Sequence, residues 1–223
     1  MSEQTLSRIA GTTILLAGLL AAAMTALELV TSPYNPYVWL YALDGPVHLA
    51  KYVAMLALLV ALPAAFVMQR ASAGRLGFVG LVLLLAGLGL AGTPYNVVEM
   101  GLNPSLSIAE ANAAWDALWS QATLLGVMGG IGLLATIVGT VSFALASRRG
   151  GGAFRRAGNA SLIGLAVGFA TIFLGSLLPG VVPYGPTWIL LGLAAYGLAV
   201  LRATGTAADS MQRGKGLAEY QPA

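Results

Sequence analysis

Six long, uninterrupted apolar segments constrain the fold of this chain more than any other feature. A helix needs about 20 mainly apolar residues to cross the hydrocarbon core of a bilayer. The segments are residues 9–30, 46–68, 76–96, 119–146, 158–178 and 186–201. They are continuously apolar rather than alternating, so a membrane β-barrel is excluded. We therefore predict an all-α, polytopic membrane protein: six transmembrane helices with short loops, within residues 1–203.

The composition agrees with this architecture and limits the chemistry of the chain. Charged residues make up 9% of the sequence, whereas a soluble domain carries about 25%. The absence of cysteine excludes disulfides and thiolate metal sites, and the single histidine excludes a haem held by two histidines. The HExxH and GxSxG motifs of hydrolases are also missing. We therefore predict no catalytic residue, no metal and no cofactor, and favour a protein that is not an enzyme.

The basic residues are distributed unevenly along the chain. Ten of the eleven lie before the first apolar segment, between the second and third, between the fourth and fifth, or after the sixth. They are Arg8, Arg70, Arg75, Arg148, Arg149, Arg155, Arg156, Arg202, Arg213 and Lys215. The positive-inside rule assigns this side to the cytoplasm. We predict a multi-pass protein of a bacterial-type inner membrane, with both termini cytoplasmic and no affinity for nucleic acid.

The first apolar segment is too long for the core of a signal peptide, so we expect an uncleaved first helix.

The loop before the fourth segment contains Ser107 and Glu110 at the spacing of a capping box, which predicts a short helix over residues 108–118 lying on the outer interface. Residues 204–223 are polar and aperiodic, which indicates a disordered cytoplasmic tail.

All four tryptophans lie on the predicted outer side, at positions Trp39, Trp115, Trp119 and Trp188. Tryptophan is typical of membrane interfaces, but a belt on one side alone is less usual. These residues are therefore candidates for a surface that packs on a partner protein.

Glycines within the apolar segments indicate close helix packing, because small residues let backbones approach in lipid. Gly164 and Gly168 form a GxxxG pair that Gly175 extends, and Gly126 and Gly130 lie in the fourth segment. Packing inside the bundle and a homodimer face are both consistent with this pattern.

One polar constellation stands out near the outer ends of the first three segments. Asp44, His48 and Lys51 share one face of a helix at spacings of four and three residues, with Asp44 as a candidate N-cap. Glu28 ends the first segment and Glu99 follows the third. Ionisable groups in a membrane usually pair or line a cavity. The five residues predict either a ligand-binding pocket or a structural lock in which Lys51 pairs with a glutamate or extends to the headgroups.

Several short stretches resemble a broad group of uncharacterised bacterial six-helix membrane proteins. They are Trp39 with 48–50, 62–64 leading to Arg70 and 74–77, 155–158, and 192–202. The resemblance implies a six-helix integral membrane protein and no particular activity or site.

Three functions remain open from the sequence. The first is a non-enzymatic accessory or structural subunit that packs through its outer aromatic face on a membrane protein or on another copy of itself. The second is a small-molecule or lipid binding protein, or a transporter, that uses the outer polar cluster. The third is an intramembrane enzyme.

Overall fold

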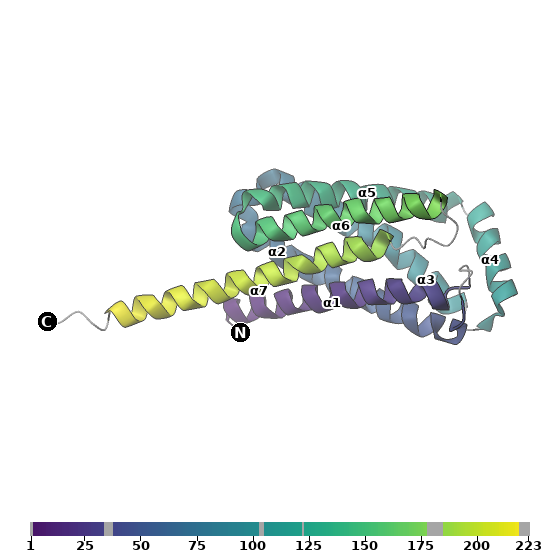
Figure 1. The fold of residues 1–223 in the computed structure, drawn as a ribbon, viewed down its shortest axis with the longest axis horizontal. Coiled ribbons are helices and arrows are strands. Elements are labelled where there is room, and N and C mark those ends of the chain that lie inside the picture. Colours follow the sequence, from purple (N-terminus) through teal and green to yellow (C-terminus); the bar gives the residue numbers. More distant parts are fainter. Residues whose placement is uncertain (1, 34–37, 103–104, 122, 178–184, 219–223) are drawn as a thin grey trace.

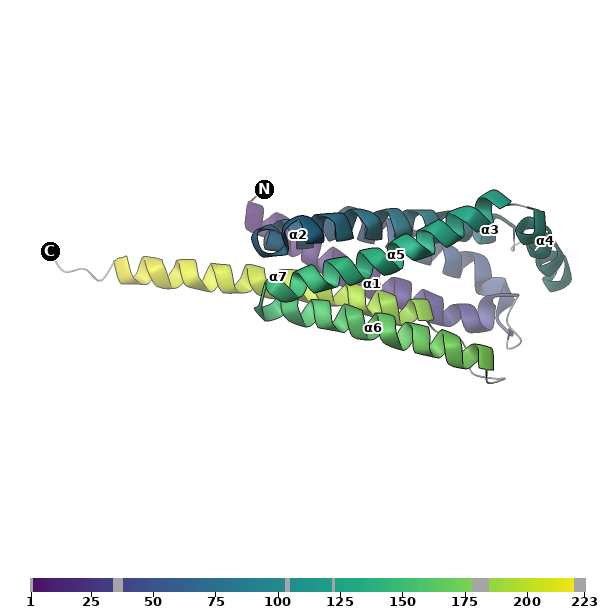
Figure 2. The same ribbon diagram turned by 90° about the horizontal axis from the view of Figure 1, so that it is seen from above.

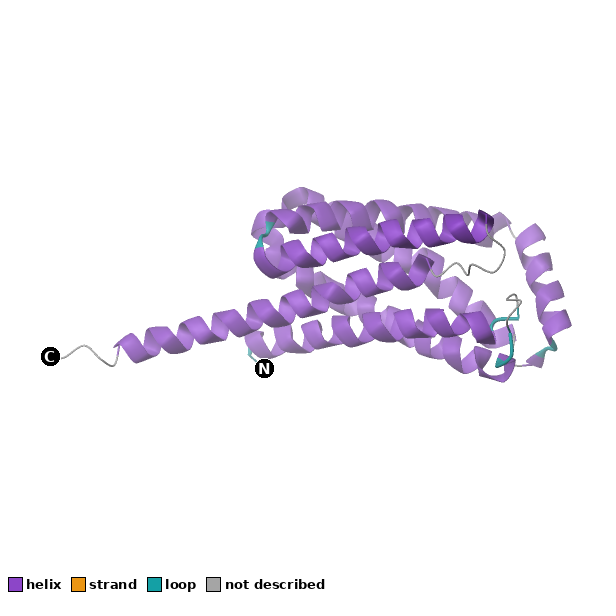
Figure 3. Cartoon of the chain, in the orientation of Figure 1, coloured by secondary structure: helices purple, strands orange, loops and turns teal. Residues whose placement is uncertain are grey.

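The structure is a computed structural model that describes residues 2–33, 38–102, 105–121, 123–177 and 185–218. Over these residues it is all-α, as predicted, and Figure 3 shows helices joined by short loops. The elements are α1 (Glu3–Thr31), the 3₁₀ turn η1 (Tyr41–Leu43), α2 (Asp44–Gly87), the π-helical turn η2 (Leu88–Gly92), α3 (Thr93–Leu102), α4 (Ile108–Gln121), α5 (Thr123–Arg149), α6 (Gly152–Leu177) and α7 (Gly185–Ala218).

Among the residues that the structure describes, five helical stretches are long and apolar enough to cross a membrane. One of them, Tyr41–Gly101, is 61 residues long and folds back on itself at Gly74, whose φ of 55° favours glycine. The two legs are antiparallel: the rings of Phe66 and Phe78 lie 5.9 Å apart near the bend, and His48 reaches Glu99 at the other end. Residues 41–101 therefore supply the second and third of six apolar legs.

The legs pack through small residues. α2 lies against α1 and α5, and α7 lies between α1 and α6. A Cβ at Gly18 of α1 would stand 2.8 Å from the Cβ of Ala194 in α7, so only glycine permits this approach. Ile14, Leu58 and Leu193 are fully buried between these helices. Figure 2 shows α5 crossing the bundle obliquely.

The predicted glycine contacts are met in part. Gly164 and Gly168 of α6 lie against the backbone of α7 at Trp188 and Gly185. Gly130 is an exception, because nothing lies within 4 Å of the position that its Cβ would take. The close contacts of α5 with α2 and η2 use Gly132 and Gly139 instead. The surroundings of Gly175 lie outside the described residues.

The charges lie at opposite ends of the bundle. Both chain termini and the α5–α6 turn lie at one end, and α4 lies across the other (Figure 1). The first end, here called the basic end, also holds the Gly74 bend, because Ser72 lies beside Gly150 of the α5–α6 turn. The second, here called the acidic end, holds Glu28, Asp44, Glu99 and Glu110.

Two local predictions have different outcomes. The capping box is present: the Ser107 backbone N–H and hydroxyl donate to Glu110 Oε2 at 2.8 and 2.7 Å, and α4 begins at the next residue, Ile108. α7 continues as a helix to Ala218 and so extends beyond the predicted span 186–201 into the polar segment. Extending a helix that is already nucleated is easier than starting a new one.

Candidate functional site

Three helices bring the predicted polar residues together at the acidic end. Glu28 lies in the last turn of α1, and the first two turns of α2 supply Asp44, His48 and Lys51. Because the second leg returns antiparallel to the first, α3 places Glu99 beside the start of α2. All five residues of the predicted cluster therefore lie within one connected group of contacts.

Asp44 differs from its predicted role as an N-cap. Leu43 holds the N-cap position, and Asp44 already has helical dihedral angles because η1 leads directly into α2. The carboxylate is therefore not needed at the helix end, and its Oδ1 lies 3.4 Å from His48 Nδ1, one turn along. Asp44 is therefore placed to orient the histidine.

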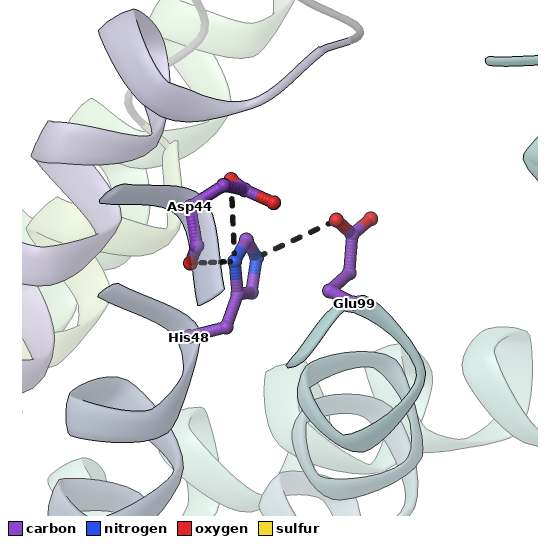
Figure 4. Close-up of side chains that lie close together, drawn as sticks. All are labelled: Asp44, His48 and Glu99. Atoms are coloured by element: carbon purple, nitrogen blue, oxygen red, sulfur yellow. Dashed lines mark hydrogen bonds and ion pairs between the residues drawn. The ribbon is translucent and has the colours of Figure 1, made fainter. Parts of the chain in front are cut away.

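His48 is fully buried at the centre of the cluster (Figure 4). Its Nδ1 lies 3.0 Å from the backbone oxygen of Asp44. Its Nε2 faces two carboxylates, with Glu28 Oε1 at 3.4 Å and Glu99 Oε2 at 3.9 Å. Each ring nitrogen therefore faces oxygen atoms, and Asp44 and Glu99 are themselves only 1% exposed.

Lys51 pairs with Glu28 and is 9% exposed. The ammonium is thus held inside the bundle by a carboxylate from α1. Glu99 is directed to His48 (Figure 4). The sequence analysis named both glutamates as candidate partners of Lys51. In the structure Glu28 contacts Lys51 and His48, and Glu99 contacts His48.

A cavity of about 300 Å³ lies beside the Lys51–Glu28 pair. Polar groups line one part of it and apolar side chains line the rest. Its lining residues are Glu28, Lys51, Met55, Leu88, Ala91, Gly92, Asn96, Leu133, Thr136, Pro186, Ile189 and Leu190. They come from α1, α2, η2, α3, α5 and α7, so the cavity exists only when the bundle is assembled.

The π-helical turn η2 contributes three of these residues, Leu88, Ala91 and Gly92. A π-helical turn widens the backbone locally and often occurs at functional sites. The cavity lies beside this turn.

Asn96 is a site residue that the sequence analysis missed. It is fully buried, lines the cavity, and donates from Nδ2 to the Gly92 oxygen at 2.6 Å. Its Oδ1 has no hydrogen-bond partner among the described residues. Its spacing of three residues from Glu99 places the two on one helix face, and that signal was present in the sequence.

The remaining predicted residues are more scattered. Trp39 is 71% exposed, Trp188 is exposed to a lesser degree and Trp115 is half-buried. The side chain of Trp119 lies outside the described part. The tryptophans therefore offer one strongly exposed ring, Trp39, at the acidic end.

The cluster also has a chemical capacity that the sequence analysis did not anticipate. Asp44, His48 and Glu99 each offer a potential metal-ligating atom, and these atoms lie within 4.8 Å of one another.

No family model, curated protein or solved structure matches this chain. The function must therefore be argued from the site.

Proposed function

We propose that this chain is a multi-pass membrane protein that binds a small amphipathic molecule in the cavity beside Lys51. The carrying observation is the cavity itself, in which a largely buried ammonium–carboxylate pair and a buried amide border an otherwise apolar wall. Binding sites for small molecules are typically concave and mostly apolar, with a few placed polar groups.

The membrane setting is supported by what covers the outside of the bundle. Large apolar side chains are exposed on several helices, among them Val60, Leu134 and Ile163, each at least 63% exposed. Such a surface is costly in water and favourable in lipid. By the positive-inside rule the basic end faces the cytoplasm, so both termini are cytoplasmic and the acidic end faces outward. A bacterial-type inner membrane is the expected location.

The lining indicates the chemistry of the ligand. The Asn96 Oδ1 can accept a hydrogen bond, which favours a ligand with a hydroxyl or amide donor. Lys51 favours an electron-rich or anionic atom nearby, and Met55, Leu88 and Leu190 favour an apolar portion. A volume of about 300 Å³ suits a molecule at the small end of the drug-sized range, or a lipid headgroup with the start of its chains.

The test compares two adjacent leucines of α5. Leu133 lines the cavity and Leu134 does not, although both are more than half exposed. We expect mass spectrometry of protein extracted in native-lipid discs to detect one retained class of amphipathic molecule. Leu133→Trp, which fills the cavity, should lose it, and Leu134→Trp should retain it. Identical small-molecule content in all three proteins would contradict the proposal.

A second function, an accessory subunit that packs through the outer aromatic face, is favoured by the exposure of Trp39. An indole this exposed at the rim of a bundle is suited to a protein contact. The same mass spectra would then show a stoichiometric protein partner, and Trp39→Ser would release it. Retention of the partner by that variant would argue against this surface.

A further inference from the structure

The orientation of His48 fixes which of its ring nitrogens carries a hydrogen. Nδ1 lies 3.0 Å from the backbone oxygen of Asp44. A carbonyl oxygen only accepts hydrogen bonds, so Nδ1 must be the donor. In a neutral imidazole the other nitrogen, Nε2, then carries the lone pair. Figure 4 shows this nitrogen directed toward Glu99.

Nε2 faces two carboxylate oxygens that are also electron-rich, Glu28 Oε1 at 3.4 Å and Glu99 Oε2 at 3.9 Å. A lone pair and two carboxylates repel one another unless a positive species lies among them. Ten of the eleven Lys and Arg residues lie on the predicted cytoplasmic side of the sequence. Lys51 is the eleventh, and it pairs with Glu28.

The charge balance of the cluster points in the same direction. Three carboxylates face one ammonium and one imidazole, so the neutral-histidine cluster carries two negative charges in excess. Excess charge of one sign in a buried site is costly unless a group of opposite charge lies beside it. A protonated imidazole would leave one excess charge, whereas a divalent cation would leave none.

The spacing suits a shared metal ion. Ligand atoms about 2.1 Å from a common metal lie about 3.0–3.4 Å from one another in octahedral or tetrahedral geometry. Nε2 lies 3.4 Å from Glu28 Oε1, within this range, and 3.9 Å from Glu99 Oε2, so a shared ion requires the Glu99 side chain to move closer. A metal-ligating histidine characteristically donates its other N–H to a carbonyl or carboxylate, which is what Nδ1 does toward Asp44.

We propose that the acidic end binds one divalent first-row metal cation through His48 Nε2 and the carboxylates of Glu99 and Glu28. Asp44 also has a potential ligand atom within 4.8 Å of those of His48 and Glu99, but it lies on the Nδ1 side of the ring, so we assign it the role of positioning the imidazole. One nitrogen and several carboxylate oxygens suit Mn²⁺, Fe²⁺ or Zn²⁺ better than a thiolate-seeking ion. This site goes beyond the proposed cavity function, although Glu28 borders both.

Equilibrium dialysis of tag-free protein in lipid discs against Zn²⁺ or Mn²⁺, with elemental mass spectrometry as the readout, tests the site. The chain suits this test because His48 is its only histidine and it has no cysteine. We expect one equivalent of metal per chain. Glu99→Gln and His48→Gln should each weaken binding at least about tenfold, and Glu110→Gln, a carboxylate outside the cluster, should leave it unchanged.

The metal spectrum separates loss of a ligand from loss of the fold. Electron paramagnetic resonance of the Mn²⁺- or Cu²⁺-loaded wild type should show coupling to one imidazole nitrogen, independently of any variant. Circular dichroism of the metal-free variants should show helix content equal to that of the wild type. Asp44→Asn keeps the backbone carbonyl and should weaken binding less than His48→Gln.

Three results would overturn the proposal: no stoichiometric metal, equal binding by His48→Gln, or ¹⁵N spectra with protons on both ring nitrogens in the presence of metal. Leu133→Trp distinguishes this site from the cavity. It should abolish retention of the amphipathic molecule and leave the metal stoichiometry at one, so either proposal can fail alone.

Discussion

One buried polar pair, on α5 and α7, consists of neutral hydroxyls, whereas the buried polar cluster around His48 at the acidic end is charged. Near the basic end, Tyr196 donates to Ser147 Oγ at 3.1 Å, and Ser147 donates to the Phe143 backbone oxygen at 2.8 Å. At the acidic end, His48 lies among the carboxylates of Glu28, Asp44 and Glu99.

The two arrangements have different costs. The hydroxyl chain ends on a backbone carbonyl, so each hydroxyl hydrogen has an acceptor and no charge is buried. Phe143 also packs its ring 4.8 Å from that of Tyr196, which adds apolar contact to the same place. The acidic cluster buries carboxylates in excess over its one ammonium, which is expensive without a further cation. An expensive arrangement is more readily explained by function than by stability.

Of the substitutions that test this difference between the two ends, Lys51→Met should cause the largest loss of stability. The substitution removes the ammonium from Glu28 and leaves a further uncompensated charge in a site where the lysine is 9% exposed. We expect a loss of about 3 kcal/mol in the free energy of unfolding, measured by reversible unfolding in mixed micelles.

The double variant Lys51→Met, Glu28→Gln is the matched control, because it removes both charges of the pair. It should recover most of the lost stability. If the single and double variants are equally destabilised, the pair is not what sustains the acidic end, and packing of the lysine stem explains the loss.

A smaller effect is expected at the basic end from Tyr196→Phe. The ring and its packing on Phe143 are kept, and Ser147 can still donate to its backbone acceptor. We expect a loss of about 1 kcal/mol, seen as a modest fall in the unfolding midpoint. A loss as large as that of Lys51→Met would remove the contrast between the two ends.

The smallest effect should come from Glu110, a carboxylate at the acidic end that is exposed rather than buried. Hydrogen bonds from the Ser107 hydroxyl, and next from its backbone N–H, lower the pKa of Glu110 below its ordinary value of 4.5. A carboxyl with a lowered folded-state pKa stabilises the fold above its unfolded-state pKa, and this contribution is lost as the pH falls through the folded-state pKa.

Hydrogen exchange of the first-turn amides of α4 measures this effect. Protection, corrected for intrinsic rates, should decrease as the pH falls below about 4.5 in the wild type. In Glu110→Gln it should be lower at neutral pH and insensitive to this titration. Equal pH dependence in both proteins would assign the titration to another group. A clear but small effect would show that burial, not charge alone, makes the Lys51 cluster costly.

Much of the fold could be predicted because its signals are local. The length and continuity of the apolar segments predict helices, and Ser107 with Glu110 predicts the start of α4, since both depend on neighbours within a few residues. The extension of α7 to Ala218 was not predicted, because the polar residues of the tail were weighed without the helix that precedes them. Which glycines lie against another helix of the bundle could not be predicted, because a glycine's neighbours on another helix are not a local property.

The candidate site divides in the same way. Asp44, His48 and Lys51 could be placed on one face of a helix from their spacing. Glu28 and Glu99 could be placed at the same depth from their positions at segment ends. Asn96 could not be ranked above other helix-end residues, because its importance depends on a cavity formed by six elements.

The sequence by itself determined that the chain is helical, that its apolar segments are long enough to cross a membrane, and that its charges lie at opposite ends. The tertiary structure alone decided that Lys51 pairs with Glu28, that Nε2 of His48 faces Glu28 and Glu99, and that a cavity adjoins them. The reason is physical. Helix formation follows from bonds four residues apart, whereas contacts between residues 28, 48 and 99 depend on the bend at Gly74 and on how closely glycines let helices approach.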